Sequence, residues 1–203
     1  MRKTILLAAA ALLVLPWAVT QAQREQEQHA RAGVQQQEEL GVRTSAEERL
    51  SGSFELAGSR QEAQARVNRA IDEAVANMSW FRRGFARTRL REKNPIRDTV
   101  RIDVGGGDVT IEYGDATYTT PEGQWRTVTA TGEQVRLLQQ VVGDRIYQTF
   151  RTEDGEKLTV YSVSDDGSRL TLDITVSSPQ LPQPLRYDLD YRRTGGAPAV
   201  AAR

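Results

Sequence analysis

The chain has 203 residues, with 27 basic and 27 acidic side chains, no cysteine and a single histidine. This balance argues against a generally cationic nucleic-acid-binding protein. Because cysteine is absent, disulfide frameworks, thiolate zinc sites, thiol nucleophiles and lipid attachment through an N-terminal cysteine are excluded. The length suits one ordinary domain with additional terminal segments.

The N-terminal segment has the parts of a secretory signal peptide. Arg2 and Lys3 form a positive start, residues 5–19 are almost wholly apolar, and Ala22 closes a cleavage-like site. The apolar run is short for a membrane span, although an uncleaved membrane anchor is the alternative. We therefore expect residues 1–22 to be a cleaved signal peptide and the mature protein to be periplasmic or secreted.

Two further segments have compositions that disfavour a packed core. Residues 23–43 are rich in glutamine and glutamate and nearly free of large apolar side chains, so we expect a flexible leader. This leader holds the single histidine, His29, which leaves a Ser-His-Asp triad without a rigidly held base. Residues 194–203, rich in Gly, Pro and Ala, are expected to form a disordered tail.

A short strand is expected around Phe54, followed by a helix. Gly58 ends the strand, and Ser59 with Glu62 then forms a capping box, which is typical of a helix start. The apolar residues that follow recur at alternating steps of four and three, which places them on one face of a helix over 60–90. They are Val67, Ile71, Ala74, Met78, Phe81 and Phe85.

This helix has one weak point and one face that we expect to be buried. Gly84 is where the helix would kink or break. The spacing favours Phe81 and Phe85 as part of the core, with the arginines of the opposite face in solvent or paired with acidic residues. Trp80 is the aromatic residue that this register explains least.

Beyond Pro95 the hydrophobic period changes to two and remains so to the end of the domain. Short turns such as Asp154-Gly155 separate the runs and indicate hairpins. With the strand at Phe54, the sequence predicts ten strands, the other nine at 100–104, 109–113, 116–119, 124–131, 134–142, 145–152, 158–164, 170–176 and 185–192. We therefore expect a mainly β fold, an antiparallel meander forming a barrel or half-barrel, with the helical segment between strands 1 and 2.

Residues 50–54, Leu-Ser-Gly-Ser-Phe, are similar to the first-strand signature of the calycin barrels, with Phe54 where Trp is usual. Tyr191-Arg192 is similar to the aromatic-basic end of their last strand. The order of elements over about 50–193 resembles the fatty-acid-binding-protein branch of that superfamily, which also includes lipocalins. The resemblance implies a barrel domain over 44–193 that carries a small apolar ligand.

The resemblance does not extend to the carboxylate site of the fatty-acid binders. That site uses Arg-x-Tyr on the last strand, whereas Arg186 and Tyr187 are adjacent here and so face opposite sides. A second comparison is the half-open barrel of periplasmic lipoprotein carriers, to which no motif can be matched.

The first functional hypothesis is a non-enzymatic carrier or sensor of a small apolar ligand or lipid, without cofactor or metal. Its candidate ligand-binding residues face the expected barrel interior or the helix, and they are Phe54, Phe85, Val100, Ile102, Ile111, Leu172 and Tyr187. The alternative is a structural or protein-interaction module of the cell envelope with a solid core, since small barrels can be filled by side chains. Nucleic acid is not an expected partner.

The neutral net charge conceals a strong asymmetry. Residues 60–101 carry a net charge of +6, and residues 102–190 carry −8. Aromatic and arginine residues are interleaved over residues 80–87 of this basic segment, a pattern typical of transient contact with an anionic membrane surface or an acidic partner. The candidate surface residues are Trp80, Arg82, Arg83 and Arg87. If the helix lies on the sheet, part of the charge asymmetry holds it there.

Overall fold

The computed structural model describes residues 45–130 and 132–195. The expected signal peptide, the leader with His29, and residues 196–203 of the expected tail lie outside this part of the chain. Residues 194 and 195, which we placed in the tail, belong to the last strand. A short helical segment over residues 45–50 precedes the first strand.

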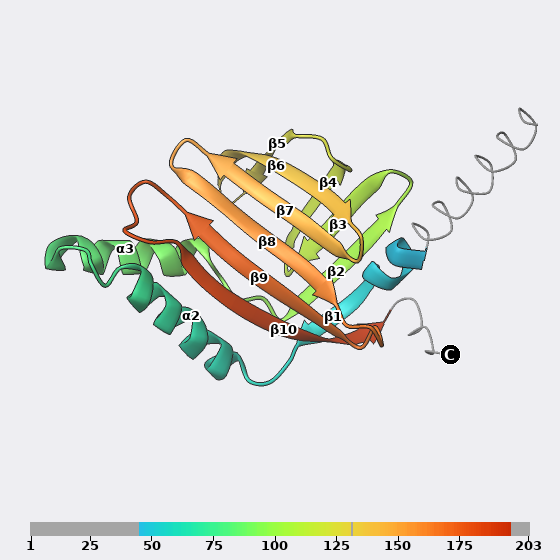
Figure 1. The fold of residues 1–203 in the computed structure, drawn as a ribbon, viewed down its shortest axis with the longest axis horizontal. Coiled ribbons are helices and arrows are strands. Elements are labelled where there is room, and N and C mark those ends of the chain that lie inside the picture. The colour runs from blue at the N-terminus through green and yellow to red at the C-terminus, as the bar shows by residue number, and fades with distance from the viewer. Residues whose placement is uncertain (1–44, 131, 196–203) are drawn as a thin grey trace, which may run out of the picture. The chain divides into compact units, whose positions relative to one another are not determined.

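The described chain forms a ten-stranded antiparallel sheet with two helices between its first two strands (Figure 1). The helices are α2 (Arg60–Ala74) and α3 (Trp80–Lys93). The strands are β1 (Gly52–Leu56), β2 (Thr99–Gly105), β3 (Asp108–Tyr113), β4 (Ala116–Pro121), β5 (Arg126–Ala130), β6 (Glu133–Val142), β7 (Arg145–Thr152), β8 (Gly155–Val163), β9 (Arg169–Ser177) and β10 (Leu185–Gly195).

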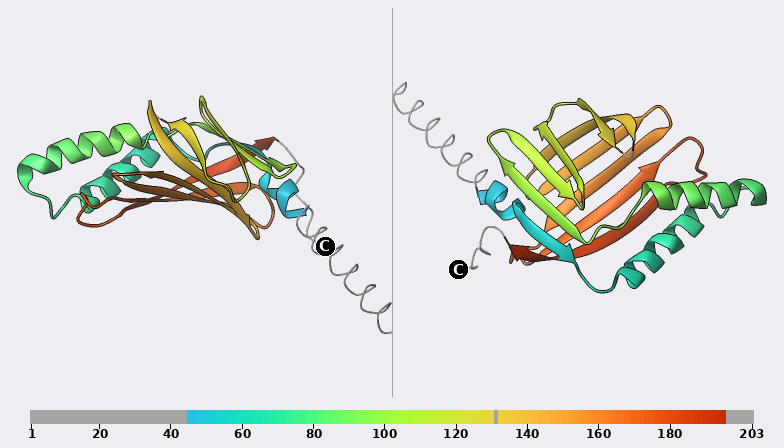
Figure 2. Two further views of the ribbon diagram at one scale, coloured as in Figure 1. Left: turned by 90° about the horizontal axis from the view of Figure 1, so that it is seen from above. Right: turned by 180° about the vertical axis from the view of Figure 1, so that it is seen from behind.

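Each strand pairs with the next along the chain from β2 to β4 and from β5 to β10, and β1 joins β2 to β10. Strands β4 and β5 are the two edges of the sheet, which curls so that they lie on the same side (Figure 2). The result is a nearly closed barrel. This confirms the predicted meander of ten strands and decides between the barrel and the half-barrel that the sequence left open.

The barrel interior follows from the period-two alternation of the strands. Along β2 the buried and exposed residues alternate strictly, with Val100, Ile102 and Val104 inside. The same phase on the other strands supplies a single apolar cluster that also includes Val67 and Ile71 of α2. Burial of these side chains is the main force that holds α2 to the sheet.

The gap between β4 and β5 is bridged by a buried glutamine rather than by strand pairing. From β6, the Nε2 atom of Gln139 donates to the carbonyl of Val109 on β3 at 2.7 Å and to Thr120 Oγ1 on β4 at 3.0 Å. Its Oε1 accepts from Gln148 Nε2 at 2.9 Å, and Tyr161 donates to Gln148 Oε1 at 2.8 Å. We call Gln139, Gln148, Tyr161 and Thr120 the glutamine clasp, because every described bond in it runs across strands.

Arg193 near the end of β10 explains the first-strand signature. Its guanidinium lies 4.5 Å from the centre of the Phe54 ring and donates to the carbonyl of Ser51 at 2.7 Å. A Cβ atom on Gly52 would collide with this guanidinium, and the φ of +155° at this position is one that other residues rarely adopt, so glycine is favoured there. The basic partner is therefore Arg193 rather than the exposed Arg192 that the sequence comparison indicated.

The single helix expected over 60–90 is two helices, and the break lies at residues 75–79 rather than at Gly84. The capping box of Ser59 and Glu62 is present, as predicted. At the break, Arg83 donates to the carbonyls of Ala76 at 2.7 Å and Met78 at 3.0 Å. These bonds satisfy carbonyls of the connection between α2 and α3, where no helical partner is available, so the chain can turn back.

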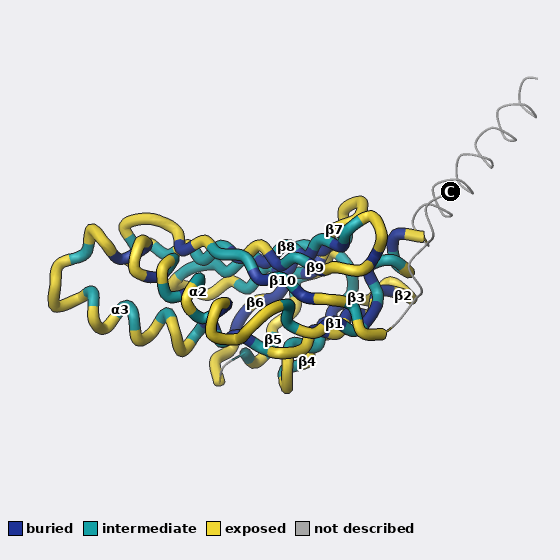
Figure 3. The backbone as a smooth tube through the Cα atoms, turned by 90° about the horizontal axis from the view of Figure 1, so that it is seen from below, coloured by how far each residue is buried: buried dark blue, intermediate teal, exposed yellow. Residues whose placement is uncertain are grey.

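The break changes the environment of the aromatic residues that we expected in the core. Phe81 is 62% exposed and Phe85 is 72% exposed, because α3 no longer continues the buried face of α2. No residue of α3 is buried, whereas α2 buries Ala63, Val67, Ile71 and Ala74. Figure 3 shows exposed and intermediate positions along the whole of α3. The prediction of core positions for these two phenylalanines is therefore wrong.

Candidate functional site

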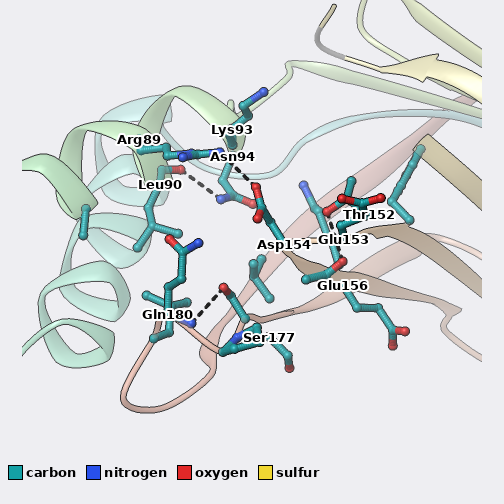
Figure 4. A pocket seen from close by; sticks show the side chains of 18 of the residues that line it. Arg89, Leu90, Lys93, Asn94, Thr152, Glu153, Asp154, Glu156, Ser177 and Gln180 are labelled. Carbon is teal, nitrogen blue, oxygen red and sulfur yellow. Dashed lines mark hydrogen bonds and ion pairs between the residues drawn. The ribbon is translucent and has the colours of Figure 1, made fainter. Parts of the chain in front are cut away.

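A pocket with a volume of about 1200 Å³ lies between α3, the nearby strand ends and the β9–β10 loop (Figure 4). Its walls come from α3, from the starts of β6 and β8, from the ends of β7 and β9, and from the middle of β4. The apolar and aromatic residues that line it are Met78, Phe81, Phe85, Ala86, Leu90, Tyr118, Ala130, Val135, Phe150, Pro179, Val176 and Leu181. A concave, largely apolar site of this size suits a small organic molecule.

Two ion pairs connect α3 to the opposite rim of the pocket. Lys93 Nζ lies 2.8 Å from Glu133 Oε1 on β6, and this lysine holds the pKa of Glu133 below its usual range. Arg89 lies 3.5 Å from Asp154 in the β7–β8 turn, as Figure 4 shows. A basic helix is thus held across the pocket mouth by acidic residues of the sheet.

Helix α2 is attached to the barrel by the same charge asymmetry. Arg66 lies 3.3 Å from Asp188 and 3.7 Å from Asp190, both on β10. Together with the two pairs at the pocket rim, these contacts confirm that part of the charge difference between the helical and sheet segments holds the helices in place. Each pair is partly exposed and contributes modestly by itself.

Three tyrosines fix the chain where α3 leads into β2. Tyr191 donates to the carbonyl of Arg97 at 3.0 Å, Tyr113 donates to the carbonyl of Pro95 at 3.3 Å, and Tyr187 donates to Asn94 Oδ1 at 3.3 Å. Burial raises the pKa of each of these tyrosines, so their hydroxyls stay protonated and can donate. The C-terminal end of α3 is therefore anchored, whereas its N-terminal turn carries the exposed Trp80.

Lys157 introduces a charge into the apolar wall. It lies on β8 in the same phase as the buried Thr159 and Tyr161, and its neighbours across the sheet are Phe150 on β7 and Val176 on β9. Within the described part of the chain, its ammonium has no hydrogen bond or ion pair. Burial away from water lowers the pKa of Lys157 from 10.5 to about 8.

The carboxylates that line the pocket form no ion pair with Lys157. Glu133 pairs with Lys93 and Asp154 with Arg89, while Glu156 accepts from Arg151 at 2.6 Å. Glu153 also lines the pocket, but it is exposed in the β7–β8 turn. Lys157 is therefore a cation of the pocket wall without a protein counter-ion among the described residues.

The ligand-binding residues that we predicted from sequence do not lie together in the structure. Phe85 lines the pocket, whereas Tyr187 does not line it but packs against the core and donates to Asn94, which does line it. The other five belong to the packed core of the barrel: Phe54, Val100, Ile102, Ile111 and Leu172. That these seven residues contact a ligand remains a prediction.

The predicted surface residues have different surroundings. Trp80 is 86% exposed and makes an edge-on contact with Phe81, and Arg82 lies 5.8 Å from the centre of that ring. Arg83 donates to carbonyls at the helix break, and Arg87 pairs with Asp72 of α2 at 2.6 Å. Arg83 and Arg87 thus stabilise the helix pair, while Trp80 and Arg82 are presented outward.

Sequence reasoning missed Lys157 and the aromatic pair of Tyr118 and Phe150, whose ring centres lie 5.0 Å apart. A signal for Lys157 was present, because the alternation of β8 places it in the inward phase with Tyr161 and Val163. A charged residue in that phase indicates either a buried ion pair or a site.

Among residues 45–130 and 132–195, no group of three or more His, Cys, Asp or Glu side chains could hold a metal ion. Over the same residues, no helix combines the length and the apolar character that crossing a membrane requires.

No protein-family model and no curated protein matches the chain. Among solved structures, it is similar to an abundant heat soluble (SAHS) protein from Ramazzottius varieornatus, with 11% identity over 71% of this chain and 94% of that chain and a TM-score of 0.48. It is also similar to a Schistosoma mansoni fatty-acid-binding protein in complex with arachidonic acid, with 17% identity over 73% and 98% and a TM-score of 0.44. The fatty-acid-binding protein of Manduca sexta shows 11% identity over 71% and 98%, with a TM-score of 0.42.

Proposed function

We propose that this protein is a non-enzymatic carrier or sensor that holds a small apolar ligand in the pocket beneath α3. The observation that carries the proposal is the pocket of about 1200 Å³, walled by Tyr118, Val135, Phe150 and Val176. A solid-core interaction module, the alternative, does not account for such a space. The interior is filled by side chains in its packed core, but not at the end covered by α3.

A neutral fluorescent probe, N-phenyl-1-naphthylamine, tests this proposal. We expect the purified protein to bind it with enhanced emission, and Val176→Trp to weaken binding about tenfold by filling the pocket. Val142→Trp is the matched control, since Val142 is 57% exposed and does not line the pocket. Equal binding by both variants, or no binding by the wild type, would contradict the proposal and favour the interaction module. Native mass spectrometry of the same preparation reveals any retained ligand.

We also propose that the protein is exported and that α3 makes transient contact with anionic membrane surfaces. Export is supported by the signal-like N-terminal sequence and is tested by fractionation and by sequencing of the mature N-terminus, which should begin after Ala22. Membrane contact is supported by the exposure of Trp80 and Phe81 beside Arg82 at the pocket entrance. A carrier with such a helix would receive or deliver its ligand at the lipid surface.

A further inference from the structure

We propose that Lys157 binds apolar aldehydes covalently and reversibly, as an imine formed within the pocket beneath α3. The inference rests on the proposed function, because the same pocket must first admit an apolar molecule. It goes further by naming a reactive group in the chain and a chemical class of ligand, the long-chain aldehydes.

The first argument is the position of the amine. Lys157 lies in the inward phase of β8 and lines the pocket, with Phe150 and Val176 at the facing positions of the neighbouring strands. An apolar chain lying against Phe150 and Val176 would bring a terminal carbonyl to the Lys157 side chain. Proximity of this kind converts a reaction between two molecules into a step within one complex.

The second argument is the state of the amine. No carboxylate of the described residues is paired with Lys157, and burial lowers its pKa to about 8. A desolvated lysine in an apolar pocket therefore supplies neutral amine near physiological pH, which is the form that attacks carbonyl groups. Lys93, which lines the same pocket, is instead paired with Glu133 at 2.8 Å.

The third argument concerns why the pocket favours an aldehyde over a carboxylic acid of the same chain length. Next to Lys157 a carboxylate head group would lack a second partner, because Phe150 and Val176 at the flanking positions offer no hydrogen-bond donor for its other oxygen. Two other cations that line the pocket, Lys93 and Arg89, already have counter-ions in Glu133 and Asp154. An aldehyde enters uncharged and meets neither obstacle.

The reaction is balanced without any further reactant. The lone pair of neutral Nζ attacks the aldehyde carbon, and the carbonyl π electrons move to oxygen. Transfer of a proton from nitrogen to oxygen gives a carbinolamine. Loss of water then forms the C=N double bond, and addition of water releases the aldehyde again. The protein would thereby hold a reactive aldehyde away from other amines.

Decanal in the presence of sodium cyanoborohydride, which reduces any imine to a stable amine, tests the inference in the full chain. Peptide mass spectrometry should find the decyl adduct at Lys157 at least about tenfold more often than at Lys93, because Lys93 is engaged by Glu133 whereas Lys157 faces the apolar wall without a counter-ion among the described residues. Glyceraldehyde, a polar aldehyde, should show no such preference for the pocket lysine.

Variants and competitors distinguish the possible failures. Lys157→Met and Lys157→Arg should lose the adduct while still binding N-phenyl-1-naphthylamine, which shows that they fold, and Lys93→Met should keep it. If the probe and decanol bind but decanal leaves no adduct at Lys157, this inference is overturned and the proposed function stands. If decanoic acid binds through Lys157 without any imine from decanal, the lysine is a counter-ion and the inference fails. If nothing apolar binds, both proposals fail.

Discussion

Lys157 is the residue whose chemistry is least compatible with its surroundings. Its side chain is partly buried among apolar residues, with no partner in the described chain, and its pKa falls from 10.5 to about 8. The charged form is therefore less stable in the folded protein than in the unfolded chain. Below pH 8 the barrel carries this destabilisation in full. A function in the pocket would account for the presence of a lysine that destabilises the folded protein.

Replacing this lysine is expected to stabilise the protein. Because the folded-state pKa lies below the unfolded value, the unfolded chain binds more protons between about pH 8 and 10.5, and stability rises with pH across that window. Lys157→Met should raise the free energy of unfolding at pH 7 by about 2 kcal/mol, a figure reduced for partial exposure, and the gain should vanish above pH 10.5. Urea unfolding at several pH values measures this difference.

Lys93→Met provides the control, since that lysine is paired with Glu133 and should show no such gain. A wild type and a Lys157→Met variant whose stabilities differ by a constant amount from pH 7 to 11 would contradict the argument.

At the scale of elements, α2 and α3 have opposite roles although they are neighbours in sequence. Helix α2 buries one face in the core and is capped by Ser59, so it belongs to the barrel. Helix α3 buries no residue and is held by Asn94 and the ion pairs at its C-terminal end and by Arg87–Asp72 along its length. Its N-terminal turn presents aromatic side chains to solvent. This arrangement suits a cover whose free end contacts another surface.

The exposed turn of α3 predicts a membrane-binding phenotype. The double variant Trp80→Ser, Phe81→Ser should bind vesicles of phosphatidylglycerol and phosphatidylcholine about tenfold more weakly than the wild type. The reason is that it lacks the two aromatic side chains whose apolar surface would be buried in the lipid interface. Arg82→Glu should also weaken binding to these anionic vesicles. Vesicles of phosphatidylcholine alone should bind the wild type and the variants only weakly. Flotation assays measure the bound fraction.

Val142→Ser serves as the matched control because it removes an exposed apolar side chain far from the helix in sequence. Vesicle binding that is equal in the wild type and in the double variant would rule out this turn as the contact surface.

At the scale of the whole molecule, closure of the barrel depends on a few polar contacts. Strands β4 and β5 do not pair, so the sheet has two edges that backbone hydrogen bonds leave separate. The glutamine clasp joins β6 to β3 and β4 across this gap, and Gly123 in the β4–β5 connection donates to the carbonyl of Gln139 at 2.8 Å. Buried networks of this kind are costly to interrupt, since every remaining member loses a partner.

Interrupting the clasp at its centre should therefore cost more than at its end. Gln139→Met keeps the side-chain size but leaves Gln148, Thr120 and the carbonyl of Val109 without its bonds, and should lower the free energy of unfolding by about 3 kcal/mol. Tyr161→Phe removes only the last bond of the network and should cost about 1 kcal/mol. Urea unfolding compares the two variants, and hydrogen exchange should increase first in β3 and β4. Equal costs would mean that the gap is closed by other contacts.

Much of the fold was predictable because it depends on local periodicity. The alternation after Pro95 correctly indicated nine strands, and the capping box correctly placed the start of α2. The same reasoning failed at Phe81 and Phe85, because a continuous spacing of apolar residues does not reveal a turn at residues 75–79. That turn is stabilised by contacts of Arg83 that only the folded helix pair provides.

The candidate site was less predictable than the fold. Strand phase identified which side chains point inward, but not which inward residues fill the barrel and which line an open space. Phe54 and Ile102 are core, while Val176 and Phe150 in the same phase line the pocket, because they lie at strand ends that α3 covers without filling.

The sequence by itself determined the order of strands, the place of the helical segment and the opposed charges of the two regions, since these depend on residue type and spacing. Tertiary structure decided that the barrel nearly closes, that the helix divides, and that Lys157 faces an apolar pocket without a counter-ion among the described residues. These features arise from contacts between residues distant in the chain, such as Gln139 with Val109 and Arg89 with Asp154. Among the described residues, opposed charges of the helical and sheet segments form ion pairs at the pocket rim, while Lys157 lies in the pocket wall without a counter-ion.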